Sequence, residues 1–96
     1  MSADNSVCIV ETAEGFLVEE LGSEFWDLCD PLKHMTQDEY VKRIGKLFAD
    51  CIKYPSRDVA VYAATEYIEE VGKWGRYVEY GITLLPKTGD APPVSG

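Results

Sequence analysis

The first third of the chain alternates short apolar runs with turn residues, a pattern typical of paired β-strands. Residues 6–12 are rich in β-branched side chains and predict one strand, and residues 16–21 predict a second. Between them, Ala13–Gly15 supplies a turn in which glycine accommodates a positive φ. The sequence therefore predicts an antiparallel hairpin near the N-terminus.

The next segment, from Ser23 to Met35, shows no sustained period. Ser23 suits the N-cap of a short helical turn. Pro31 interrupts any continuation, because the residue before a proline disfavours the helical conformation. We expect an irregular segment that contains one or two helical turns.

Helical spacing of apolar residues begins after Thr36. Thr36 and Glu39 match a capping box at the start of a helix, and Pro55 stops that helix. The apolar positions fall at helical spacing and predict one inward face: Tyr40, Val41, Ile44, Leu47, Phe48, Cys51 and Ile52. Two acid-before-base pairs are expected to support the helix: Asp38 with Lys42, and Glu39 with Arg43.

A second helix is predicted from Ser56 or Asp58 to about Gly72. Its expected inward positions are Val61, Ala64, Tyr67, Ile68 and Val71. The run Val59–Tyr62 also fits a strand, but the length of the segment and its alanine content favour a helix.

The last periodic segment, residues 77–84, alternates as a strand with one buried face. Four side chains are expected on that face: Val78, Tyr80, Ile82 and Leu84. Residues 86–96 are mainly Pro, Gly and small polar residues and predict a disordered tail. The expected fold is α+β, with a three-stranded antiparallel sheet and two helices on one face in the order β-β-α-α-β. It forms a single domain over residues 1–85 with one core rather than two.

The net charge of −8 is concentrated in one part of the chain. Residues 1–32 contain eight acids and no Lys or Arg, whereas residues 33–96 contain nine acids and nine bases. Such an acidic region argues against direct binding to nucleic acid or to an anionic membrane, since both require a basic surface. It favours a basic protein surface as the partner.

The segment Glu24–Asp30 is the most unusual local feature, because it places large apolar side chains among three acids. Aromatic anchors with a charged rim suit a basic partner. In the alternative interpretation, Phe25 and Leu28 cover the open end of the sheet and the acids face water. The candidate partner-binding residues are Glu19, Glu20, Glu24, Phe25, Trp26, Asp27 and Asp30.

The sequence gives only weak indications of thiol catalysis or metal binding. Cys29 and His34 form the only closely spaced thiol–imidazole pair, but the acids around them tend to raise a thiol pKa. Three widely spaced cysteines without a CxxC predict reduced thiols, and no metal site or cofactor is expected. No apolar run approaches the ~20 residues that cross a bilayer. The N-terminus lacks the features of a signal peptide, so we expect a cytoplasmic protein.

The two ends of the chain carry a resemblance. Met1–Asn5 is followed at once by a strand, and an alanine-rich helix leads to the E-Y-G-I run Glu79–Ile82. These features resemble small phage- and prophage-encoded proteins of unassigned function, which open M-S-A-D-N-G; here Ser6 stands in place of the glycine. The resemblance implies a viral accessory protein in the host cytoplasm. Small acidic accessory proteins of phages include inhibitors of host defence, among them anti-CRISPR proteins.

Three functional hypotheses follow. The leading one is a non-enzymatic protein-binding module that docks on a basic surface of a host protein, such as a nucleic-acid-binding groove. The alternative is a structural or self-assembling homodimer, because an open sheet leaves unpaired edges. The third is a small thiol enzyme that uses Cys29 and His34.

Overall fold

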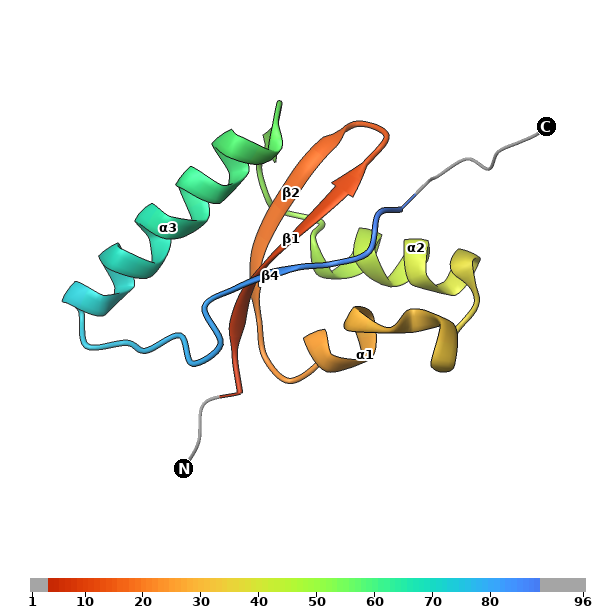
Figure 1. Ribbon diagram of the computed structural model, residues 1–96, viewed down its shortest axis with the longest axis horizontal. Coiled ribbons are helices and arrows are strands. Elements are labelled where there is room, and N and C mark those ends of the chain that lie inside the picture. Colours follow the sequence, from red (N-terminus) through yellow and green to blue (C-terminus); the bar gives the residue numbers. More distant parts are fainter. Residues whose placement is uncertain (1–3, 89–96) are drawn as a thin grey trace.

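The predicted hairpin lies at the centre of the protein. The computed structural model describes residues 4–88 (Figure 1). β1 (Ser6–Thr12) and β2 (Gly15–Leu21) pair antiparallel, as predicted, with Ile9 opposite Val18. Gly15 has a φ of 137°, which side-chain-bearing residues rarely adopt, so the turn requires glycine at this position.

The sheet has four strands and is mixed, so the prediction of a three-stranded antiparallel sheet was wrong. β3 (Lys53–Tyr54) pairs antiparallel with β2, and β4 (Ile82–Leu84) pairs parallel with β1. The strand order is β3-β2-β1-β4. A parallel partner is possible for β1 because a long helical segment precedes β4 and returns the chain to the other end of the sheet.

The helices cover both faces of the sheet, which corrects the prediction that they share one face (Figure 1). One face carries α1 (Phe25–Cys29), the short 3₁₀ turn η1 (Pro31–Lys33) and α2 (Gln37–Leu47); the other carries α3 (Arg57–Lys73). The element order is therefore β-β-α-α-β-α-β. Two layers of buried side chains result, one on each face, rather than the single core expected.

The apolar run in β1 explains this arrangement. Val7, Cys8, Ile9 and Val10 are all buried, with Cys8 and Val10 facing the α1–α2 layer and Val7 and Ile9 facing α3. A strand covered on both faces needs apolar residues at successive positions instead of alternate ones.

The predicted start signals of the two long helices are confirmed. Thr36 and Glu39 form the capping box, with the Glu39 N–H donating to Thr36 Oγ1 at 3.1 Å and the Thr36 N–H donating to Glu39 Oε1 at 2.8 Å. Ser56 caps α3 through its hydroxyl, 3.3 Å from the Val59 nitrogen. Val59–Tyr62 is helical, and the Ser23–Met35 segment contains α1 and η1 as expected.

Two other helix signals are wrong. α1 begins after Glu24 without a side-chain cap from Ser23, and α2 ends at Leu47, well before Pro55. Val41 and Ile52, predicted to face inward, are exposed.

The last strand is shorter than predicted. The prediction covered residues 77–84, but only Ile82–Leu84 form β4, because Gly81 turns the chain with a φ of 60°. Tyr80 and Leu84 are exposed instead of buried, and Leu85 takes the inward position.

The chain beyond the last strand follows β1 for four more residues, Leu85 to Thr88. The Thr88 N–H donates to Glu11 O at 3.0 Å, and the Tyr40 hydroxyl donates to Pro86 O at 2.6 Å. Pro86–Thr88 therefore pack against the sheet and α2, and the remainder of the predicted disordered tail lies outside the described residues.

Candidate protein-binding surface

The two neighbouring acids of β2, Glu19 and Glu20, lie on opposite faces of the sheet, as strand geometry requires. On the α1–α2 side, burial raises the pKa of Glu19, and the carboxylates of Asp50 and Glu20 raise it further. The two acids therefore do not act as one binding element.

Glu20 is held inside a polar network at one end of α3. Arg76 Nη2 donates to both carboxylate oxygens, at 2.7 and 2.8 Å, and Asn5 Nδ2 donates at 2.7 Å; the Tyr67 hydroxyl is a third donor. Burial on its own would raise the pKa of Glu20, but the hydrogen bonds outweigh it and hold the pKa below its usual range. Because its charge is compensated internally, Glu20 has little capacity for a partner.

Phe25 and Trp26 have different environments. Phe25 is 2% exposed and belongs to the buried α1–α2 layer, in agreement with the core interpretation of this residue. Trp26 is 49% exposed. Its ring stacks on Phe25 with centroids 4.5 Å apart and meets Tyr80 edge-on with centroids 5.1 Å apart. Only Trp26, of the two predicted anchors, is accessible, and it is held in a fixed orientation.

Two carboxylates, those of Asp4 and Glu79, lie near the Tyr80 hydroxyl, and Glu24 comes just before Phe25 and Trp26 in the sequence. Glu24 Oε1 and the Asp4 carbonyl oxygen both lie close to Gly22, in the loop after β2. Glu79 precedes Tyr80, and partial burial together with the Glu79 and Asp4 carboxylates raises the pKa of Tyr80. We call this set the aromatic–acidic surface: Asp4, Glu24, Trp26, Glu79 and Tyr80.

Asn5 ties the distant parts of this surface together. The Tyr80 N–H donates to Asn5 O at 3.0 Å, and the Glu79 N–H donates to Asn5 Oδ1 at 3.0 Å. These bonds fix the segment before β4 against the residue that follows Asp4. Asn5 therefore brings Asp4 close to Glu79 and Tyr80 in the fold.

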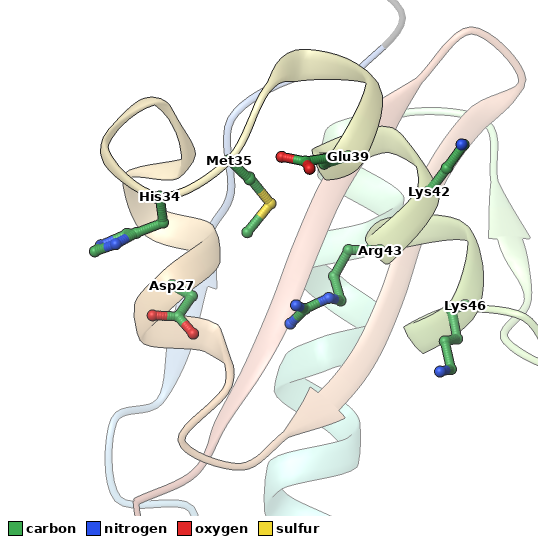
Figure 2. A pocket seen from close by; sticks show the side chains of 7 residues that line it. All are labelled: Asp27, His34, Met35, Glu39, Lys42, Arg43 and Lys46. Carbon is green, nitrogen blue, oxygen red and sulfur yellow. The ribbon is translucent and has the colours of Figure 1, made fainter.

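The last two predicted residues, Asp27 and Asp30, make other contacts. Asp30 pairs with Lys33 at 3.2 Å. Asp27 lies on the wall of a hollow between α1 and α2, across from Arg43 (Figure 2). Asp27 follows Trp26 in the sequence but lines this hollow, and Asp30 is engaged by Lys33, so we leave both out of the aromatic–acidic surface.

The hollow has a volume of about 480 Å³ and carries both charge signs. Its lining residues are Asp27, His34, Met35, Glu39, Lys42, Arg43 and Lys46 (Figure 2). Within residues 4–88, the predicted helix pairs Asp38–Lys42 and Glu39–Arg43 are absent from the ion pairs closer than 4.0 Å. Of the three bases on α2, only Arg43 extends toward Asp27, while Lys42 and Lys46 point away from it (Figure 2). The lining therefore offers no single sign of charge.

The thiols have the character of unreactive side chains. Cys29 is exposed, yet burial of its sulfur raises its pKa, and no hydrogen bond joins it to His34 in the described part of the chain. Burial raises the pKa of Cys8 to about 12. Neither thiol carries the lowered pKa that nucleophilic catalysis requires.

Three members of the surface were missed by sequence reasoning: Asp4, Glu79 and Tyr80. Alternation predicted an inward Tyr80, and the positive φ of Gly81 reverses this. Asn5 and Glu79 are 74 positions apart, so no local pattern joins them. The one signal that could have found them is the concentration of tyrosine in the C-terminal half, which does not locate a surface.

Comparisons with known proteins gave no relative for this chain. No protein-family model matches it, and no curated protein or solved structure shows significant similarity. Over residues 4–88, no helix is both long and apolar enough to span a membrane. The same residues contain no cluster of three His, Cys, Asp or Glu side chains arranged to hold a metal ion.

Proposed function

We propose that this chain is a non-enzymatic protein-binding module that docks on a basic surface of a partner protein through the aromatic–acidic surface. The observation that carries the proposal is the exposed Trp26 ring, oriented by Phe25 and Tyr80, with the Asp4 and Glu79 carboxylates near the Tyr80 hydroxyl. Tryptophan and tyrosine dominate binding energies because they bury a large area at low entropic cost. An acidic rim around them accelerates association with a basic partner and disfavours acidic ones.

The partner we propose is a nucleic-acid-binding host protein, met in the host cytoplasm by a phage-derived accessory protein. A groove that binds nucleic acid presents clustered Lys and Arg side chains, the complement of Asp4, Glu24 and Glu79. Occupation of such a groove would inhibit the host protein by competition with its nucleic acid, as an anti-CRISPR-like inhibitor of host defence would do.

The test is affinity capture from the host lysate with identification of bound proteins by mass spectrometry. We expect Trp26→Ala to reduce recovery of the partner by about tenfold or more, because it removes the anchor of the surface. Trp74→Ala is the matched control, since Trp74 is also exposed and lies at the end of α3. Equal recovery with both variants would contradict the proposal.

A charge series examines the rim separately. Glu24→Gln combined with Glu79→Gln should weaken capture and flatten its dependence on salt, because two of the three rim charges are lost. Glu66→Gln combined with Glu70→Gln removes the same charge from the exposed side of α3 and serves as the control. If both pairs weaken capture equally, net charge and not this surface is responsible.

A further inference from the structure

The outer edge of β4 is unpaired in the described part of the protein. The Val7 N–H donates to Gly81 O at 2.8 Å, and the Leu85 N–H donates to Ile9 O at 2.8 Å. Backbone groups alternate between the two edges of a strand, so residues 81, 83 and 85 point toward β1. The N–H and C=O groups of Ile82 and Leu84 therefore point away from the sheet, and among residues 4–88 no strand lies beyond them.

The two edges of the sheet differ in their protection. β3, at one edge, contains Lys53 and is followed directly by Pro55, two residue types that block edge-to-edge pairing. β4, at the other edge, has the sequence Ile82-Thr83-Leu84, with neither charge nor proline. Leu84 is 54% exposed, although it lies on the face of the sheet that α3 covers. The β3 edge is therefore protected against pairing with another strand, whereas β4 itself carries no protecting residue.

We propose that two copies of this chain pair antiparallel along β4 to form a two-fold symmetric dimer with a continuous sheet. With Thr83 on the symmetry axis, Ile82 of each copy stands opposite Leu84 of the other. This register matches the outward backbone groups, and each such pair exchanges two hydrogen bonds. It also covers the exposed Leu84 with the Ile82 side chain of the second copy.

The charges that flank β4 and the positions of the helical layers are both compatible with this register. Glu79 precedes β4 and Lys87 follows it, so antiparallel pairing brings the acidic end of one strand toward the basic end of the other. The two-fold axis is perpendicular to the sheet, which places α3 of both copies on one face and the α1–α2 layers on the other. β4 is the edge strand of the sheet and lies between these layers (Figure 1).

The dimer uses a different edge of the protein from Trp26, although Glu79 belongs to both proposals, and one variant separates the dimer from other modes of association. Leu84→Pro removes the outward N–H while leaving the bonds of Thr83 and Leu85 to β1, because proline is tolerated on an edge with its nitrogen toward solvent. Leu84→Lys retains the N–H but replaces the apolar pair with a charge, and it serves as the second variant if the first fails to fold.

The experiment measures mass by analytical ultracentrifugation from micromolar to millimolar protein, with amide hydrogen exchange on the same samples. We expect the wild-type mass to double with concentration, and the exchange of the Ile82 and Leu84 amides to slow by about tenfold or more as it does so. Both variants should keep the mass of one chain, with native circular dichroism. Trp26→Ala should dimerise normally.

Three results would overturn the dimer. The first is a wild-type mass of one chain at millimolar concentration, and the second is a dimer that survives in the folded Leu84→Pro or Leu84→Lys variant. The third is a dimer that Trp26→Ala abolishes, which would assign self-association to the aromatic–acidic surface. The first two results leave capture of a basic partner by the aromatic–acidic surface untouched, so the two proposals fail separately.

Discussion

The two faces of the sheet are stabilised by different means. The α1–α2 face buries large side chains such as Phe25, Tyr40 and Phe48. The α3 face buries Ala60 and Ala64, which let the helix approach the strands closely, and it is tied at one end by the Glu20 network. One face therefore relies on apolar volume, which does not depend on pH, and the other relies in part on an ionised group, which does.

The largest effect should come from Phe48→Ala on the apolar face. Phe48 is 3% exposed, and its truncation leaves a cavity in the α1–α2 layer. We expect a loss of about 3–5 kcal/mol in the free energy of unfolding measured in urea. Ile52→Ala is the control, since Ile52 is 66% exposed and its truncation should cost less than about 0.5 kcal/mol. Similar losses for both would refute the assignment of this layer as the main source of stability.

The Glu20 network should contribute less and depend on pH. Glu20→Gln removes a charged acceptor and should cost about 1–2 kcal/mol at neutral pH. Because folding lowers the pKa of Glu20, its stabilisation is complete above the ordinary glutamate pKa and is lost as the pH falls through the lowered value. The difference in unfolding free energy between wild type and Glu20→Gln should therefore shrink on acidification.

The neighbouring acid on the other face provides the matched control. Folding raises the pKa of Glu19 through burial and through the Asp50 and Glu20 carboxylates, so its ionised form is disfavoured in the folded protein. Glu19→Gln should stabilise the protein slightly at neutral pH, the opposite sign to Glu20→Gln. Two losses of equal size would show that the faces do not differ in their electrostatics.

The helix N-caps should give the smallest difference between the two layers. Thr36 makes the reciprocal capping box of α2, whereas Ser56 makes a single, longer bond at the start of α3. Thr36→Ala should cost about 1 kcal/mol, and Ser56→Ala about 0.5 kcal/mol, by thermal or urea unfolding. A larger loss at Ser56 would reverse the expected order.

The features that the sequence predicts correctly are local. The hairpin, the capping box and the Ser56 cap depend on residues within a few positions of one another. β3 was missed because two residues, Lys53 and Tyr54, carry no period. The placement of α3 was missed although the uninterrupted run Val7–Val10 indicates a strand buried on both faces.

The candidate surface was predicted in part for the same reason. Trp26 and Glu24 were identified because they lie two positions apart in a segment of unusual composition. Asp4 and Glu79 join them only through the hydrogen bonds of Asn5 to the segment before β4, which depend on the tertiary fold. Likewise, Glu20 is unavailable to a partner because Arg76, just after the end of α3, binds its carboxylate. Local patterning does not specify that position.

The parallel pairing of β1 with β4 has a consequence for folding. The central strand is made first on the ribosome, but its second neighbour, Ile82–Leu84, follows more than seventy residues later. Until then, one edge of Val7–Val10 is an unpaired apolar strand, the kind of segment that aggregates. Contacts of such long range slow folding, because the chain must close a large loop before it gains from them. Pairing of the C-terminal segment with β1 therefore converts an aggregation-prone intermediate into the native protein. Chains that terminate before Ile82 should aggregate instead of folding.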